Sequence, residues 1–418
     1  MNHAVLNTDY DDYSAQQIVA AVPHISIGAF CDDERTVQAI QAAAADRRMS
    51  RAHVQIHMGG IANAIQTFQS ELTPNVILVE TTANRDVVLA GLTQLAQVCG
   101  PDTKVIVIGH LNDVLLYREL MRLGVSEYLV APVHQLQIIE SIATLFHDPA
   151  AKPLGRIFAF VGSKGGVGSS TLAHNVGWYL SRQLNTDTII TDFDLAFGTA
   201  GLNFNQETSQ GVADALGQPD RVDQTLLDRL LTKCGDKLSL LASPGAIDRD
   251  VHVESSSVEI ILNTVRNSVP CVVVDVPNMW APWIKHTLLQ ADEVVITATP
   301  ELASLRNTKN LVDLLRQSRP NDRPPRLVMN QIGIPKRPEI PVADFAKAIN
   351  LEPALTIAYD AHTFGTAASN GQMLAEVSAK AKSAEAVAVL AQILLGQEKP
   401  AKPAKFSLPF AGKFLRKK

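Results

Sequence analysis

The 418-residue sequence predicts an α/β protein with two parallel sheets, each flanked by helices. Short apolar runs alternate with helix-like segments along most of the chain, as in doubly wound sheets. A Pro/Ala/Gly-rich stretch, 147–155, separates two such series, and a glycine-rich loop, 162–171, follows the first apolar run of the second series. We therefore expect a disordered leader (1–22), a first domain (23–146), a linker (147–155), a second domain (156–396) and a basic tail (397–418).

The first series predicts a doubly wound (βα)5 domain, and the second predicts a larger parallel sheet whose strands are apolar on both faces. In the first domain we expect strands at 25–30, 54–57, 75–80, 104–108 and 127–130, with helices at 34–45, 86–98 and 112–123. In the second we expect strands at 157–161, 188–191, 238–242, 272–276, 294–298, 326–329 and 355–358, and a last helix over about 372–395.

Composition narrows the function classes. A net charge of −5 gives no general attraction to nucleic acid. The four cysteines lie far apart with no CxxC pair, so neither a metal cluster nor a disulfide framework is expected. No apolar run reaches the roughly 18–20 residues of a membrane span, and the N-terminus is polar and acidic. These features predict a cytoplasmic protein.

The glycine-rich loop lies between an apolar strand and a helix that we expect to begin near Ser169. Glycines let the backbone aim successive N–H groups at phosphate oxygens, and the helix N-terminus adds partial positive charge. An ordinary strand–helix turn does not require a lysine before two glycines. The predicted phosphate-binding residues are Gly162, Ser163, Lys164, Gly165, Gly166, Val167, Gly168, Ser169, Ser170 and Thr171.

The segment from Lys164 to Gly168 resembles the deviant Walker A loop of the MinD/ParA (SIMIBI-type) family of P-loop NTPases, K-G-G-x-G-K-[ST]. The resemblance implies ATP and Mg²⁺ as ligands and a homodimer in which Lys164 reaches the partner's nucleotide. It assigns Ser170 to the Mg²⁺. Ser169 departs from the pattern, because it replaces the lysine that contacts the β- and γ-phosphates. This change puts affinity and turnover in question, so we expect at most a weak ATPase.

Acidic residues at two further strand ends extend the resemblance. Asp192 and Asp194 form a D-x-D segment, in which the family pattern assigns Asp192 to the magnesium shell and makes Asp194 orient the attacking water. Asp275 ends an apolar run and matches the Walker B carboxylate, which holds Mg²⁺ through water. The ordinary alternative is that these carboxylates only cap strand ends.

Later segments follow the family order. Residues 299–306 resemble the P-E-x-x-S segment at the dimer and nucleotide edge. Asn330 ends a strand, and the resemblance makes it read the adenine edge, although such an Asn is often only a cap. Tyr359 and Asp360, with 368–371, occupy the region that closes over the base.

The first domain resembles a CheY-type receiver without its phosphotransfer groups. Asp32 and Asp33 could supply the acidic pair, but Glu80 stands at the acceptor position. Gly109 and Ala131 stand where receivers carry a hydroxyl residue and a lysine. Phosphotransfer is therefore not expected. We expect the domain to dock a partner or to dimerise, with mimicry of a charged state by Glu80 as a further hypothesis.

A degenerate receiver joined to a MinD/ParA-like domain resembles the CpaE/TadZ family of Flp (tight-adherence, type IVb) pilus assembly proteins. The stretch Ala173–Trp178 is typical of that family. The resemblance implies an ATP-binding localisation and assembly factor beside a pilus secretion ATPase and inner-membrane platform proteins. It also implies recruitment to the inner membrane or cell pole, where a polar marker protein would be a further partner.

The tail holds seven basic residues and no acidic one over 399–418. One interpretation is a solubilising disordered segment. The other is a peripheral membrane anchor, because Phe406, Phe410, Phe414 and Leu415 recur at helical spacing, although Pro409 interrupts a helix.

Three functions remain open from the sequence. The first is a nucleotide-controlled dimeric switch for pilus assembly. The second is a ParA-like DNA- or cargo-partitioning ATPase, which the acidic main body disfavours. The third is a scaffold with little or no hydrolysis, which Ser169 favours.

Overall fold

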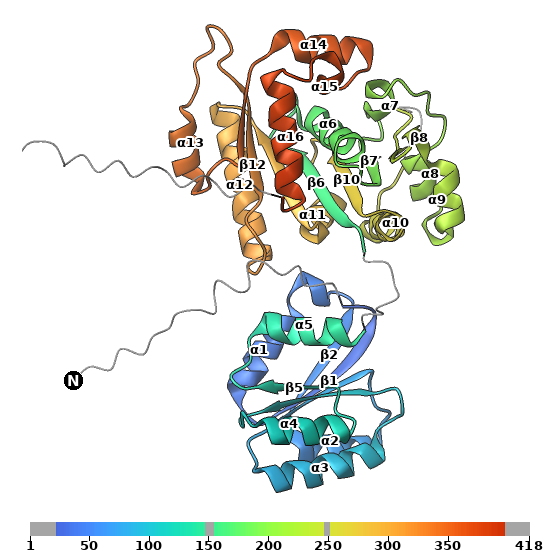
Figure 1. Ribbon diagram of the computed structural model, residues 1–418, viewed down its shortest axis with the longest axis vertical. Coiled ribbons are helices and arrows are strands. Elements are labelled where there is room, and N and C mark those ends of the chain that lie inside the picture. The colour runs from blue at the N-terminus through green and yellow to red at the C-terminus, as the bar shows by residue number, and fades with distance from the viewer. Residues whose placement is uncertain (1–21, 147–153, 246–250, 398–418) are drawn as a thin grey trace, which may run out of the picture. The chain divides into compact units, whose positions relative to one another are not determined.

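The structure is a computed structural model that describes residues 22–146, 154–245 and 251–397 (Figure 1). Its internal contacts divide the described residues into two compact units, 22–146 with 313–324, and 154–312 (without 246–250) with 325–397. The predicted leader apart from Val22, and the predicted tail apart from Gln397, lie outside the described residues. Within those residues no helix combines the length and the apolar character needed to cross a membrane.

The strands of the first unit are β1 (Ile25–Cys31), β2 (Ala52–Met58), β3 (Val76–Thr81), β4 (Lys104–Gly109) and β5 (Glu127–Val130). Its main helices are α1 (Glu34–Ala44), α2 (Gly60–Phe68), α3 (Arg85–Val98), α4 (Val114–Arg122) and α5 (Gln135–Leu145). The strands form one parallel sheet in the order β2-β1-β3-β4-β5. One buried apolar cluster packs the sheet against α1 and α5, and another packs it against α2, α3 and α4. The predicted doubly wound (βα)5 fold is confirmed.

The second unit contains an eight-stranded sheet. Its strands are β6 (Arg156–Gly162), β7 (Thr188–Asp192), β8 (Thr232–Gly235), β9 (Leu238–Leu241), β10 (Cys271–Val276), β11 (Glu293–Ala298), β12 (Arg326–Ile332) and β13 (Leu355–Ala358). The remaining helices are α6 (Ser169–Arg182), α7 (Ala200–Asn203), α8 (Val212–Gly217), α9 (Gln224–Leu230), α10 (Ser255–Ser268), α11 (Pro282–Gln290), α12 (Leu302–Ser318), α13 (Val342–Ile349), α14 (Ala361–Asn370), α15 (Leu374–Val377) and α16 (Lys382–Leu394).

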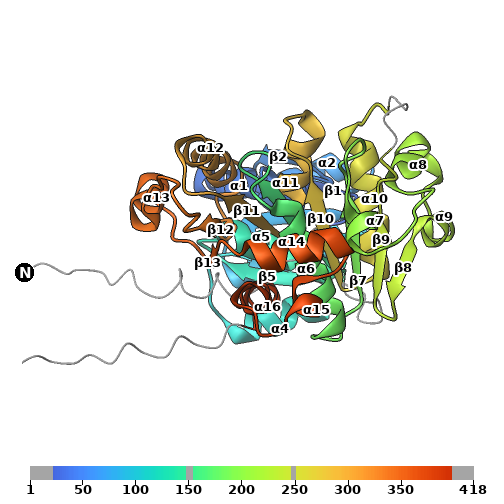
Figure 2. The same ribbon diagram turned by 90° about the horizontal axis from the view of Figure 1, so that it is seen from above.

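The strand order is β13-β12-β11-β6-β10-β7-β9-β8. Helices α6 and α16 cover one face of this sheet, whereas α10, α11 and α12 lie on the other (Figure 2). Strands β6, β7, β10 and β11 are almost entirely buried, as the apolar runs predict for strands covered on both faces. The predicted parallel sheet flanked by helices is confirmed as the architecture of this unit.

Two details differ from the sequence prediction. Strand β8 was not expected, and it pairs with β9 in the antiparallel direction at the sheet edge. Its sequence, Thr-Lys-Cys-Gly, carries no apolar run, because an edge strand needs no fully apolar face. The predicted single helix over 372–395 is also wrong. It is divided into α15 and α16, since the backbone of Ser378 is extended and that of Ala381 is not helical either.

Candidate functional site

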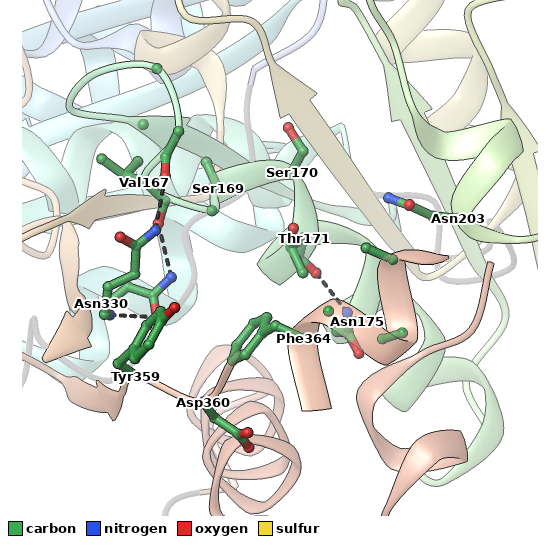
Figure 3. Close-up of a pocket in the computed structure, with 18 of the residues that line it drawn as sticks. Val167, Ser169, Ser170, Thr171, Asn175, Asn203, Asn330, Tyr359, Asp360 and Phe364 are labelled. Carbon is green, nitrogen blue, oxygen red and sulfur yellow. Dashed lines mark hydrogen bonds between the residues drawn. The ribbon is translucent and has the colours of Figure 1, made fainter. Parts of the chain in front are cut away.

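The candidate site lies at the carboxyl ends of neighbouring parallel strands, where open α/β sheets bind ligands. Strand β6 lies between β10 and β11, and the glycine-rich loop leaves its end. A cavity of 610 Å³ opens there (Figure 3). It is lined by the loop, the first turns of α6, the end of β12 and the start of α14. The structure thus brings the predicted loop residues from Lys164 to Thr171 to one cavity.

Side-chain amides hold the carbonyl groups of the loop. Asn278 donates to Gly162 O (3.1 Å), Asn307 to Ser163 O (2.8 Å), Gln331 to Gly166 O (2.9 Å) and Asn330 to Val167 O (2.8 Å). In a planar trans peptide the carbonyl and the next N–H point in opposite directions. The N–H groups of Lys164, Val167 and Gly168 are therefore directed away from these amides. Several N–H groups on one side of a tight loop form a concave anion site.

Two loop glycines have left-handed backbone angles, with φ of +78° at Gly166 and +91° at Gly168. A Cβ atom at Gly168 would lie 2.6 Å from Nδ2 of Asn330. Glycine is therefore required at position 168 both by the left-handed backbone angle and by the close approach of the Asn330 amide, which holds the loop.

Two aromatic side chains, Tyr359 and Phe364, also line the cavity, together with Asp360 (Figure 3). Asp360 caps α14, and hydrogen bonds from Thr363 lower the pKa of its carboxyl. Asn330 is 3% exposed, and besides donating to the loop its Oδ1 accepts from Gln331 N (2.9 Å). Both amide atoms thus hold protein groups, and reading of the adenine edge by Asn330 stays a prediction.

Sequence reasoning missed several residues that line the cavity. They come from α6, α7, β12 and α14. Two had a sequence signal: Gln331 follows Asn330, and Asn175 lies in the family-typical stretch Ala173–Trp178. These residues are Asn175, Asn203, Gln331 and Phe364.

Strand register brings two of the predicted carboxylates together. Asp275 of β10 lies directly opposite Asp192 of β7, and the two are 3% and 0% exposed. Asp192 accepts from the backbone N–H groups of Asp194 (3.0 Å) and Ala200 (3.1 Å). Burial, followed by the charge of Asp275, raises the pKa of Asp192 to about 7.

This raised pKa predicts a pH-dependent stability of the protein without nucleotide or metal. The folded chain holds the Asp192 proton more tightly than the unfolded chain, so stability is lost as the pH rises from about 4 to about 7. In Asp192→Asn we expect this loss to disappear, which makes the variant more stable at pH 8 by on the order of 2 kcal/mol and equal or weaker at pH 4. Urea unfolding in EDTA measures it, with exposed Asp220→Asn as the control. A stability difference that is constant with pH would contradict the prediction.

A divalent cation fits the oxygen donors of this site. Oδ1 of Asp275 is buried without a hydrogen-bond partner among the described residues, and so is the hydroxyl of Ser169. Ser169 and Ser170 line the cavity, and so does Val276, the residue that follows Asp275. Carboxylate and hydroxyl oxygens are the ligands that Mg²⁺ prefers. Atoms of Asp192, Asp275 and His174 that could ligate a metal lie within 4.8 Å of one another, and His174 was not predicted.

The remaining two predicted residues have partners within the chain. Nζ of Lys164 lies 2.8 Å from Oε1 of Glu301, and its hydrogen bond lowers the pKa of that carboxyl. Asp194 is half-buried, and its Oδ1 accepts from the N–H of Phe197 (3.0 Å). The trans contact of Lys164 and the water-orienting role of Asp194 stay predictions.

In the first unit, Glu80 stands at the position of the phospho-accepting residue of a receiver domain. Its buried carboxylate accepts from the N–H groups of Asp32 and Asp33 (2.8 Å each) and from the hydroxyl of Thr36 (2.6 Å). His110 lies 3.3 Å from it. A phosphate would have to displace this carboxylate from the same N–H groups. A side chain at Gly109 is excluded as well, because its Cβ would lie 2.2 Å from the Tyr128 hydroxyl oxygen.

We expect Glu80→Gln to destabilise the protein by about 1 kcal/mol, because a neutral amide oxygen replaces the charged acceptor of the two N–H groups, and the new NH₂ can pair with Thr36 only if that hydroxyl turns to accept. Thermal unfolding of the full chain measures this change. Exposed Glu71→Gln in the same unit is the matched control and is expected to stay within about 0.5 kcal/mol of wild type. Equal unfolding of the two variants would show that the carboxylate does not hold the pocket.

Comparison with known proteins adds the family. A crystal structure of the pilus assembly protein CpaE from Caulobacter crescentus is 47% identical, covering 31% of this chain and 98% of that one, with a TM-score of 0.30. The chain belongs to the CpaE family of pilus assembly proteins. Identity over nearly the whole of that chain, rather than the TM-score, carries this assignment. No protein-family model matches the chain.

The CpaE-family chain also resembles ATPases over a larger share of its length. A ParA family ATPase from Chlorobium tepidum is 25% identical, covering 56% of this chain and 98% of that one, with a TM-score of 0.52. MinD from Pyrococcus horikoshii, complexed with Mg-ADP, is 16% identical and shares the fold, with 58% and 96% covered and a TM-score of 0.51. MinD of Helicobacter pylori is 26% identical over 161 residues, which are 38% of this chain and 58% of that protein. The chain thus spans little more than half of that curated relative.

Proposed function

We propose that this chain binds ATP with Mg²⁺ and acts in Flp pilus assembly as a nucleotide-controlled dimeric switch with slow hydrolysis. The observation that carries the proposal is the loop whose carbonyls are held by four amide side chains at the mouth of a 610 Å³ cavity. Such a loop binds phosphate through its backbone, and Tyr359 and Phe364 offer apolar faces for a base. The Mg-ADP complex of the MinD neighbour supports the choice of ligand.

The charges of the site explain why a metal is part of the proposal. Among the described residues that line the cavity, Lys164 is the one lysine or arginine, and Ser169 stands where the family pattern has a second lysine. Mg²⁺ supplies positive charge beside the phosphates when it is bound. Asp192, Asp275 and Ser170 are the residues that would hold it, directly or through water. The hydroxyl of Ser169 can donate to a phosphate oxygen, which needs no charge.

A dimer is proposed because large apolar side chains that follow the carboxyl ends of β7, β10 and β11 are exposed to solvent. Phe197 follows the Asp194 segment, Trp280 follows β10, and Leu302 follows Glu301, and their exposed fractions are 71%, 58% and 75%. Exposed apolar groups that gather at one edge favour an interface with a second protein surface. A second copy of the chain would cover them and bring its Lys164 to the nucleotide. Pilus partners and placement at the membrane or pole are proposed from the family alone.

The competing function is a nucleotide-binding scaffold without turnover, which the uncharged Ser169 favours. Nucleotide binding and phosphate release should be measured for wild type, Asp194→Ala and Ser169→Lys. We expect micromolar binding by wild type, loss of its slow hydrolysis in Asp194→Ala, and about tenfold tighter ATP binding in Ser169→Lys through a new charge-assisted bond.

These variants separate the two functions. If all three proteins bind nucleotide but release phosphate only at the background rate, the hydrolysing switch is excluded and the scaffold function is supported. The absence of binding by wild type would overturn the proposal as a whole. Exposed Lys285→Ala, on α11, is the control for nonspecific effects of charge.

A further inference from the structure

One buried side chain next to the proposed metal site is used by none of the roles above. His174 lies in the second turn of α6 and is 0% exposed. Its Nδ1 lies 2.8 Å from Nδ2 of Asn203. An amide nitrogen can only donate, so Nδ1 accepts and the ring proton is on Nε2.

The protonated nitrogen faces the Walker B carboxylate. Nε2 lies 3.4 Å from Oδ2 of Asp275 but is not aligned for a hydrogen bond, and neither Nε2 nor Oδ1 of Asp275 has such a partner among the described residues. A nitrogen that carries a proton cannot ligate a metal. It can instead donate to a carboxylate and fix the direction of the oxygens. Such bonds are often long in ligand-free sites and shorten when the ligand binds.

We propose that His174 is a positioning residue that orients the Asp275 carboxylate toward the bound cation, with Asn203 fixing the imidazole. The inference rests on the proposed binding of nucleotide with Mg²⁺. Asn203 ends α7, which follows the Asp194 segment, so the same ring connects that segment to the carboxylate. A displacement of α7 is transmitted to Asp275 through two side-chain contacts.

The test compares two substitutions of His174 by unbranched side chains of similar length, glutamine and methionine. His174→Gln keeps an N–H donor within reach of Asp275, whereas His174→Met fills similar space without one. The affinity of the full chain for fluorescent mant-ADP is measured in Mg²⁺ and in EDTA. We expect the gain in affinity due to Mg²⁺ to fall by about tenfold in His174→Met and to stay within about threefold of wild type in His174→Gln. Affinity in EDTA is expected to be unchanged in both.

Asn203→Ala keeps the inference testable if a buried His174 variant fails to fold, because Asn203 is only half-buried. We expect a smaller decrease of the same Mg²⁺-dependent gain, and no further decrease when it is combined with His174→Met. Three results would overturn the inference. The first is a loss of mant-ADP affinity that is the same in Mg²⁺ and in EDTA, and the second is an equal loss in the Met and Gln variants. The third is a wild-type Mg²⁺-dependent gain in affinity in His174→Met or in Asn203→Ala. Co²⁺ binding to the nucleotide-free protein that requires His174 would also overturn it, because Nε2 would then be a ligand. Wild type without any Mg²⁺-dependent gain would instead overturn the proposed function itself.

Discussion

Replacing Lys164 with alanine is expected to abolish ATP-dependent dimerisation while leaving ADP binding by the single chain within about threefold of wild type. In the single chain Lys164 is paired with Glu301, and both side chains are 37% exposed. An ion pair with that exposure contributes little to folding, so the variant should keep its fold. In the dimer, the same ammonium group would be a positive charge that one chain offers to the partner's phosphates. Removal of this ammonium group is therefore expected to weaken the dimer and not the binding of ADP by the single chain.

Sedimentation velocity with ATP and Mg²⁺ measures the dimer, and mant-ADP fluorescence measures binding by the single chain. Glu301→Gln gives a second test, because it releases Lys164 without removing it. We expect dimerisation of Glu301→Gln to be equal to or stronger than that of wild type. A dimer that persists in Lys164→Ala would mean that another surface holds the two chains together.

Replacing Gly168 with alanine is expected to weaken nucleotide binding by about 100-fold, which corresponds to about 2.7 kcal/mol. The left-handed backbone at φ +91° disfavours alanine by about 1–2 kcal/mol. In addition, the new methyl group would lie 2.6 Å from the Asn330 nitrogen that holds Val167 O. The loop must therefore move or lose that hydrogen bond, and either change misplaces the N–H groups that face the phosphates.

Gly165 provides the matched comparison within the same loop. Its φ lies outside the left-handed region, and an added Cβ would meet nothing closer than Oδ1 of Asn278 at 3.9 Å. Gly165→Ala is therefore expected to unfold at the wild-type temperature, whereas Gly168→Ala is expected to unfold earlier. Calorimetry of both proteins, with mant-ADP binding of each, measures the difference. Wild-type affinity in Gly168→Ala would refute the role given to the loop backbone.

Local sequence patterns predicted most of the fold. Fully apolar runs marked the buried strands, because a strand covered on both faces has no polar side. Strand β8 was missed for the opposite reason, since an edge strand of four residues carries no such run. The break between α15 and α16 was missed because the residues around Ser378 continue a helical pattern while their backbone is extended.

The site was predictable where its chemistry lies within one short segment. The loop from Gly162 to Thr171 and the strand-end residues Asp192 and Asp275 follow from sequence, because parallel strands place their carboxyl ends at one edge. The ring of His174 and the amides of Asn278 and Asn307 did not follow, since their contacts join segments more than 25 residues apart. Spacing along a chain gives no information on such pairs.

The four amide side chains that hold the glycine-rich loop have a consequence for its response to solvent. Amides neither titrate near neutral pH nor form ion pairs, so salt does not screen their hydrogen bonds to the loop carbonyls. The Lys164–Glu301 pair is half-exposed and is weakened as ionic strength rises. Added salt therefore leaves the shape of the phosphate cradle unchanged and loosens the lysine that the proposal assigns to a second chain.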